Sequence, residues 1–248
     1  MKVLIACEFS GIVRDAFSRR GHDAWSCDLL PTESELTKQE GKHIQGDVLE
    51  ILGDGWDLMI AHPPCTYLCS SGIHWNKRGS DYEKSQRVSK TLDALMFVKS
   101  LMNASINKIA IENPIGVIST RIRKPDQYIQ PYHHGHPESE KTCLWLKNLP
   151  YLIPTNIVSK NIYTWPAWIS GTGGTFECTI HGMAVHDCPC PPIEEWTVDP
   201  YVTGGKTVWS NQTPSGQNKI GPSKDRWKIR SMTYPGIAEA MAEQWGKE

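Results

Sequence analysis

DLMIAHPPCTYLCSSG, at residues 57–72, decides how this sequence folds. Residues 57–61 form a short, largely apolar run that predicts one buried β-strand. The strand must end near His62, because the two prolines that follow lack the backbone N–H that a central strand donates. Cys65 therefore comes directly after a buried strand, on backbone that two proline rings hold rigid.

Further strands and helices alternate on both sides of this stretch. The hydrophobic pattern predicts strands at 2–7, 25–29, 108–111 and 142–146, and helices at 13–20, 85–102 and 234–245. In the long helix, the residues that recur at helical spacing are Val88, Leu92, Leu95, Met96 and Lys99. This alternation predicts an α/β fold, a doubly wound and mostly parallel sheet.

Ligands of such sheets bind outside the carboxyl ends of the strands. The residues expected at those ends are Gly11, Asp28, Asp47, Cys65 and Glu112. The glycine-rich patterns of a dinucleotide site and of a phosphate loop are both missing from the first strand end. Aspartates that simply terminate strands are the alternative for Asp28 and Asp47.

The length and composition suit one large domain with a small addition. The chain has 248 residues, of which 39% are hydrophobic and 21% charged, as in ordinary globular proteins. After residue 150 the sequence becomes rich in Pro, Gly, Trp and Thr and loses helical periodicity. We expect a main domain at 1–149, a small irregular lobe at 150–221, and a C-terminal segment at 222–248 that returns to the main domain.

Charge and cysteine content bound the partners and the location. The net charge of −1 gives no global sign of nucleic-acid binding, so such a contact must come from local clusters. Two basic clusters exist, Lys77, Arg78, Lys84, Arg87, Lys90 and Lys219, Lys224, Arg226, Lys228, Arg230, with solvated surface charge as the alternative for each. No apolar run approaches the roughly 20 residues of a membrane span, and no signal peptide is recognisable. We expect a cytoplasmic protein with no membrane partner, whose eight cysteines are reduced thiols, metal ligands or a nucleophile.

Cys65 and Glu112 match one chemical problem. Carbon 5 of cytosine is too electron-poor to attack a methyl sulfonium unaided. Addition of a thiolate to carbon 6, with a protonated carboxyl at ring nitrogen 3, converts carbon 5 into a nucleophile. Cys65 would supply the thiolate, and Glu112, with a pKa raised in a closed pocket, the proton. An inert buried cysteine is the alternative for Cys65 taken alone.

The order and spacing of these residues resemble the DNA cytosine-5 methyltransferases, and most of all the compact members carried by bacteriophages. Phe9-Ser10-Gly11 resembles their cofactor motif, Pro64-Cys65 their catalytic dipeptide, and Glu112-Asn113 their Glu-Asn pair. Residues 135–141 resemble a Gly-x-Pro-Gln-x-Arg-x-Arg stretch, and residues 231–246 the C-terminal helix of the cofactor pocket. The likeness covers residues 1–146 and 222–248.

The chain departs from the family pattern at several positions. Ile12-Val13 stand where a glycine pair is usual, and Pro114 replaces a common valine. The paired arginines are reduced to Lys141, with Arg121 and Arg123 as alternatives. These departures affect the cofactor fit and the contacts to the base.

The resemblance implies a Rossmann-like S-adenosylmethionine-dependent methyltransferase fold and methyl transfer to carbon 5 of cytosine in double-stranded DNA. The cytosine would be flipped into the pocket, the loop at 66–90 would close over it, and the lobe at 150–221 would occupy the target-recognition position. The implied catalytic residues are Cys65, Glu112, Asn113 and Lys141, and the implied cofactor-binding residues are Phe9, Ser10, Gly11, Asp28, Asp47 and Pro63. We expect a monomer that acts in the host cytoplasm if a phage encodes it.

A second cluster raises the question of a structural zinc. Cys178, His181, Cys188 and Cys190 are the ligand set we favour, and His186 is a fifth candidate for four positions. A lobe this small would gain stability from a metal. Unligated thiols and surface histidines are the alternative.

Two other functions stay open at this point. The His-Pro-Pro-Cys segment is a variant of the Asp/Asn-Pro-Pro-aromatic motif of amino-methylating DNA methyltransferases, although His62 and Cys65 supply neither of its functional groups cleanly. A non-catalytic DNA-binding protein on the same fold is the third hypothesis.

Overall fold

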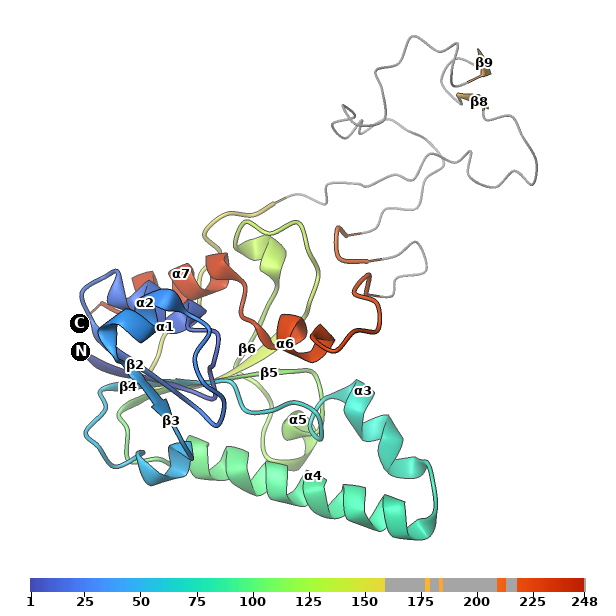
Figure 1. Cartoon of the computed structure of the whole chain (residues 1–248), viewed down its shortest axis with the longest axis horizontal. Helices are drawn as coiled ribbons and strands as arrows, with labels where there is room; N and C mark the ends of the chain where they lie inside the picture. The colour runs from blue at the N-terminus through green and yellow to red at the C-terminus, as the bar shows by residue number, and fades with distance from the viewer. Residues whose placement is uncertain (159–176, 179–182, 185–208, 213–217, 248) are drawn as a thin grey trace.

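Seven strands form one sheet in the order β3-β2-β1-β4-β5-β7-β6 (Figure 1). The strands are β1 (Lys2–Ala6), β2 (Asp23–Asp28), β3 (His43–Gln45), β4 (Leu58–Ala61), β5 (Lys108–Pro114), β6 (Gln127–Ile129) and β7 (Thr142–Lys147). The first five pair in parallel, whereas β7 runs antiparallel to both β5 and β6. This computed structural model describes residues 1–158, 177–178, 183–184, 209–212 and 218–247.

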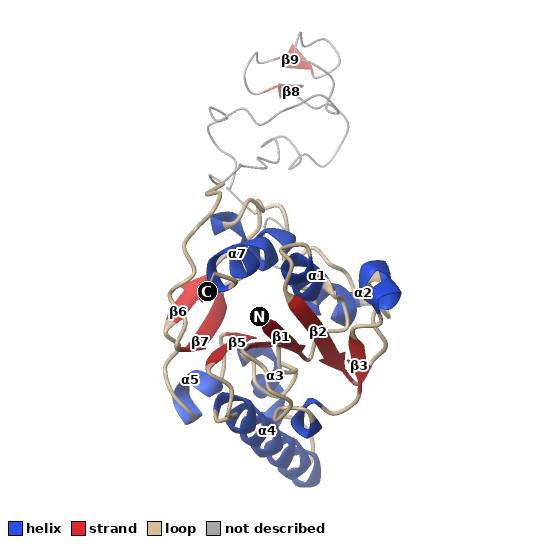
Figure 2. Ribbon diagram, turned by 90° about the vertical axis from the view of Figure 1, so that its left-hand side faces the viewer, coloured by secondary structure: helices blue, strands red, loops and turns tan. Residues whose placement is uncertain are grey.

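Helices cover both faces of the sheet (Figure 2). The helices α1 (Ile12–Ser18), α2 (Glu35–Glu40) and α7 (Pro235–Trp245) lie on one side, and α3 (Ser70–Ile73), α4 (Asp81–Met102) and α5 (Ile118–Arg121) on the other. A further short helix, α6 (Arg226–Ser231), precedes α7, and β8 (Glu177–Cys178) pairs with β9 (Met183–Ala184) apart from the main sheet. The expected α/β class, a doubly wound and mostly parallel sheet, is confirmed. No helix in the described ranges is long and apolar enough to cross a membrane.

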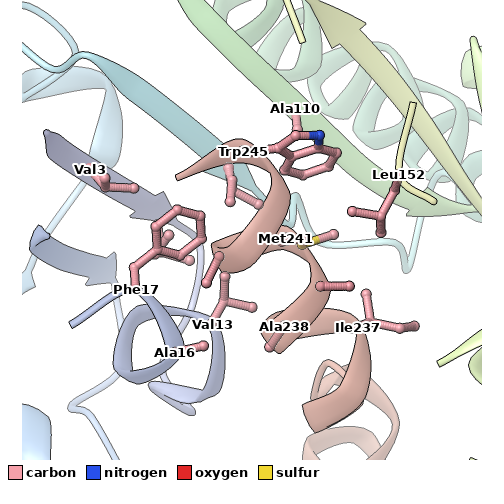
Figure 3. Close-up of a cluster of buried hydrophobic side chains, with 14 of the residues drawn as sticks. Val3, Val13, Ala16, Phe17, Ala110, Leu152, Ile237, Ala238, Met241 and Trp245 are labelled. Atoms are coloured by element: carbon pink, nitrogen blue, oxygen red, sulfur yellow. The ribbon is translucent and has the colours of Figure 1, made fainter. Parts of the chain in front are cut away.

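The strand alternation divides the apolar residues between two cores. Val3 and Ile5 of β1 face the layer of α1 and α7, whereas Leu4 and Ala6 face the layer of α4. Figure 3 shows the first core, in which Trp245 of α7 lies between the sheet and Leu152. The Trp245 side chain is 1% exposed and donates its indole N–H to Pro150 O at 3.0 Å. The C-terminal helix is therefore an integral layer of the α/β domain.

The long helix begins earlier and buries a different face than its sequence indicates. It starts at Asp81 because Ser80 and Glu83 form a reciprocal capping box. Its buried residues are Thr91, Leu95, Val98 and Leu101, whereas Val88, Leu92 and Met96 are 47%, 57% and 68% exposed. Of the residues expected on the buried face of this helix, only Leu95 is buried, so the prediction of that face was wrong. The face that is buried starts with a threonine and therefore carries a weaker apolar signal in the sequence.

Strand β5 extends to Pro114, three residues beyond the predicted end at Ile111. The extra residues pair with the antiparallel β7, in which Asn113 faces Cys143 and Pro114 faces Thr142. A proline is tolerated there because it ends the strand. The extension carries Glu112 and Asn113 on a strand rather than on a loop, which restricts their backbone.

Two leucines of α4 test the buried face with the same substitution. Leu101→Ala removes a fully buried side chain and should lower the free energy of unfolding by about 2–5 kcal/mol. Leu92→Ala, at an exposed position of the same helix, should change it by no more than about 0.5 kcal/mol. Urea denaturation followed by circular dichroism measures both, and equal losses would mean that α4 is oriented differently.

Candidate active site

A pocket opens where β4 and β5 end, at the carboxyl edge of the parallel part of the sheet. Its walls come from the turn after β4, the end of β5, the approach to β7 and the segment between α6 and α7. The lining residues are His62, Pro63, Pro64, Cys65, Glu112, Asn113, Pro114, Ile129, Glu140, Thr142, Arg230, Ser231, Met232, Thr233, Tyr234 and Ile237. The predicted Cys65 and Glu112 thus share one pocket, as neighbouring strand ends require.

Backbone and amide hydrogen bonds hold the proline turn in place. The amide nitrogen of Asn113, a residue 1% exposed, donates to Pro63 O at 2.7 Å. The backbone N–H of His62 continues the sheet by donating to Ala6 O at 2.9 Å. Beyond the prolines, Cys65 O accepts from the N–H groups of Leu68 and Cys69, both at 2.9 Å. Cys65 therefore begins a closed turn whose start is fastened to β5.

His62 and Glu112 form a pair at the base of the pocket. His62 Nδ1 lies 3.2 Å from Glu112 Oε2, and the two side chains are 8% and 21% exposed. Burial lowers the pKa of His62, but the hydrogen bond and charge of Glu112, with the charge of Glu8, outweigh it and raise the pKa overall. Among the described residues, His62 Nε2 is buried without a hydrogen-bond partner.

Cys65 and Cys69 form a hydrogen-bonded thiol pair beside Glu112. The hydrogen bond with Cys69, burial, and the charges of Cys69 and Glu112 raise the pKa of Cys65, and the positive charge of Arg230 opposes them. Cys69 is the N-cap residue of α3. Hydrogen bonds from Cys65, from Ser71 and from the first N–H groups of that helix lower the pKa of Cys69 to about 5. The hydrogen bond between the two thiols thus favours ionisation of Cys69 over ionisation of Cys65.

The residues expected to bind a cofactor lie along the same sheet edge. Phe9 and Gly11 follow β1, Asp28 ends β2 and Asp47 follows β3, and these three strands are neighbours. Asp28 Oδ1 accepts from Leu30 N and Asp47 Oδ1 from Leu49 N, each at 2.9 Å, so both carboxyls are held by their own turns.

Burial raises the pKa of Asp28, against the hydrogen bonds of its turn. Burial raises the pKa of the Cys7 thiol, and the charges of Asp28 and Asp47 add to this, so both carboxyls lie near the end of β1. The carboxyl oxygens of Asp28 and Asp47 are acceptors that fit the hydroxyl and amino groups of a nucleoside.

Glu8 is a site residue that the sequence prediction missed. Its carboxyl is buried and accepts from the backbone N–H groups of Val13 at 2.7 Å and Arg14 at 3.2 Å. The first turn of α1 is therefore capped by the protein's own carboxyl, whose pKa is raised by burial against these hydrogen bonds. The signal was present, since Glu8 directly precedes Phe9-Ser10-Gly11 and stands where an apolar strand ends.

Helix α6 connects the two parts of the site. Its Trp227 ring lies 6.0 Å from the Phe9 ring between centroids, and its Lys228 forms an ion pair with Glu33 in the loop after β2. One turn later, Arg230 lines the Cys65 pocket. The segment of sequence that returns after residue 222 thus borders both the cofactor-binding candidates and the thiol.

Lys141 does not join the pocket. Its ammonium lies 4.2 Å from the centre of the Tyr128 ring, while its neighbours Glu140 and Thr142 both line the pocket. Alternation along an extended segment explains this, because residues 140 and 142 point to one side and residue 141 to the other. Of the alternatives, Arg123 pairs with Asp126 at 2.8 Å and is likewise outside the pocket lining.

The zinc prediction falls mostly outside the described residues. Cys178 lies in β8, whereas His181, Cys188 and Cys190 belong to the part of the chain that the structure does not describe. Within the described ranges, no group of three or more His, Cys, Asp or Glu side chains is arranged to hold a metal ion.

Comparisons with known proteins add little to this geometry. No protein-family model matches the chain, and no curated protein matches its sequence. Among solved structures it is similar to a crystal structure of a protein assigned as a DNA modification methyltransferase and encoded within an E. coli prophage. The identity is 16% and the TM-score 0.39, over 66% of this chain. The chain spans 55% of that structure's length.

The His62–Glu112 pair predicts a measurable pH effect. Glu112→Gln removes the main term that raises the His62 pKa, so the His62 pKa should fall, because burial then dominates. Nuclear magnetic resonance titration of the His62 ring protons measures this directly.

The raised pKa of His62 makes the stability of the fold depend on pH. Protonated His62 stabilises the folded wild type below its ordinary pKa of 6.5, and this contribution is lost as pH rises through the raised value. The stability difference between wild type and Glu112→Gln should therefore shrink as pH rises. An unchanged His62 pKa in the variant would contradict the pairing.

Proposed function

We propose that this chain transfers the methyl group of S-adenosylmethionine to carbon 5 of cytosine in double-stranded DNA. The observation that carries the proposal is the shared pocket of Cys65 and Glu112, with a thiol and a carboxyl on neighbouring strand ends. A thiol nucleophile and an acid in one pocket are what addition to the pyrimidine ring requires.

In the proposed reaction, the Cys65 sulfur forms a bond to carbon 6 and the carbon 5–carbon 6 π bond breaks. Its electron pair is shared between carbon 5 and nitrogen 3, and nitrogen 3 takes a proton from Glu112. Carbon 5 then takes up the methyl group, and its proton leaves to a base. The Cys65 thiolate departs as the carbon 5–carbon 6 double bond re-forms, and nitrogen 3 returns its proton to Glu112. Cys65 must first lose its own proton, and the Cys69 thiolate in contact with it is the acceptor within reach.

S-adenosylmethionine would supply an electrophilic methyl group on a sulfonium. Asp28 and Asp47 would accept hydrogen bonds from its hydroxyl and amino groups, and Phe9 would pack against its rings. Ser10, Gly11 and Pro63 complete the group we assign to the cofactor. Gly11 has a positive φ of 73°, a conformation that suits glycine and lets the β1–α1 turn close tightly.

DNA would approach over the loop at 66–90, with the target cytosine flipped into the pocket. The basic residues of this loop differ in their contacts. Arg87 donates to Gly72 O at 2.9 Å and to Asn76 Oδ1 at 3.2 Å, so it holds the loop together. We assign Lys77 and Lys90 to contacts with the DNA phosphates. We assign the lobe at 150–221 to target recognition.

The His62–Glu112 pairing disfavours amino methylation. That chemistry needs residue 62 to accept a hydrogen bond from the target amino group, whereas the hydrogen bond and charge of Glu112 raise the pKa of His62 and favour its protonated ring, which only donates. Residue 65 would also have to supply an aromatic ring for stacking, and it is a cysteine.

A covalent trap tests the proposal. Duplex DNA of mixed sequence that contains 5-fluorocytosine should form a stable protein–DNA adduct in the presence of S-adenosylmethionine, because fluorine cannot leave carbon 5 as a proton does. Denaturing electrophoresis with mass spectrometry of the linked peptide would place the bond at Cys65.

Two matched cysteine variants sharpen this experiment. Cys65→Ser should form no adduct, whereas Cys69→Ser should still form it, with a changed pH dependence. An adduct that persists in Cys65→Ser, or that maps to Cys69, would contradict the proposed mechanism.

A further inference from the structure

Arg230 brings a permanent positive charge to the Cys65 pocket from a distant part of the sequence. It lines the pocket together with Cys65, Glu112 and Glu140. Among the described lining residues it is the one Lys or Arg. Its charge acts on both Cys65 and Glu140, in the direction that favours their anionic forms.

Contacts on both the N-terminal and the C-terminal side of Arg230 hold its segment in place. On its N-terminal side, α6 is fastened by the Lys228–Glu33 ion pair and by the contact of Trp227 with Phe9. On its C-terminal side, Tyr234 donates its hydroxyl to Glu140 Oε2 at 3.4 Å, and Gly236 N donates to His136 Nε2 at 2.9 Å. The arginine is thus presented to the pocket by a segment anchored at both ends.

The pocket needs such a cation. It contains two carboxyls, Glu112 and Glu140, and burial raises the pKa of Glu140 against the opposing charge of Arg230. A thiolate on Cys65 would add a negative charge to the same space. Without a nearby cation, like charges of this kind disfavour ionisation of the thiol.

We infer that Arg230 is a catalytic residue, which stabilises the Cys65 thiolate and then donates hydrogen bonds to the cytosine oxygen at carbon 2. The inference rests on the proposed function. When sulfur bonds to carbon 6, the displaced electron pair reaches nitrogen 3 and is shared with this oxygen. Glu112 gives its proton to nitrogen 3, and Arg230 keeps all of its protons. A guanidinium suits this role because it stays charged and offers several donors in one plane.

The assignment also explains why Lys141 can point away. The cation expected next to β7 lies over Tyr128, while Glu140, one residue earlier, faces the pocket. The charge that the resemblance placed at residue 141 is instead supplied by α6.

Two readouts test the role of Arg230. The variants are Arg230→Gln, Arg230→Lys and Lys141→Gln. Each is made in a Cys69→Ser background, so that Cys65 is the one thiol of the pair that titrates. The first readout is the rate of Cys65 alkylation by iodoacetamide against pH, without DNA, followed by peptide mass spectrometry. Arg230→Gln should move the midpoint to higher pH, Arg230→Lys should move it less, and Lys141→Gln should leave it at the position of the parent protein.

The second readout is the rate of adduct formation with 5-fluorocytosine DNA. Arg230→Gln should slow it by about 100-fold or more, the usual loss when one donor to a developing oxyanion is removed. Arg230 is exposed, so the variant should fold, and its thermal unfolding midpoint checks this.

The two readouts separate the inference from the proposed function. A parent protein that forms no adduct refutes the proposed function, and the alkylation profile still reports whether Arg230 acts on Cys65. An Arg230→Gln protein with an unchanged alkylation midpoint and an unchanged adduct rate would overturn the inference, as would a Lys141→Gln protein that shows the larger loss in both.

Discussion

A buried hydrogen bond of 2.7 Å, from the Asn113 side chain to Pro63 O, joins the ends of β4 and β5. The proline turn has few backbone donors of its own, so this amide supplies the partner that the Pro63 carbonyl needs in the interior. The bond connects the segment that carries Cys65 to the strand that carries Glu112. Much of the site's geometry depends on it, because the two functional side chains are each within two residues of its ends.

The parallel sheet also brings the other candidate site residues to the edge where Cys65 lies. Neighbouring parallel strands end at one edge, so Phe9, Asp28 and Asp47 come to the same side of the molecule as Cys65. Helix α6 then crosses from Phe9 and Glu33 to the thiol pocket, and α7 anchors this segment in the core beside α1. The C-terminal segment therefore contributes both to folding and to the site.

Much of this arrangement could be predicted from residues that act locally. Proline stops a strand wherever it occurs, and the carboxyl ends of parallel strands meet by geometry, so the approach of Cys65 to Glu112 followed from the sequence. The features that escaped prediction depend on partners far along the chain. Arg230 lies 165 residues after Cys65 (230 minus 65), and no periodicity relates them.

Local ambiguity explains the other differences. Lys141 and Glu140 are adjacent, and only the register of β7 with β5 decides which one faces the pocket. Helix α4 carries two apolar rows, and packing on the sheet selects the row that includes Thr91. Glu8 stands in a strand-end motif, but its role as the cap of α1 appears only when the turn at Gly11 closes.

The most direct measurement is the identity of the modified base. Duplex DNA of mixed sequence is incubated with the protein and S-adenosylmethionine that carries an isotopically labelled methyl group, and is then digested to nucleosides for mass spectrometry. We predict labelled 5-methyldeoxycytidine, which Cys65→Ser abolishes. Label in N4-methyldeoxycytidine or N6-methyldeoxyadenosine, or no label in DNA from a protein that binds S-adenosylmethionine, would contradict it.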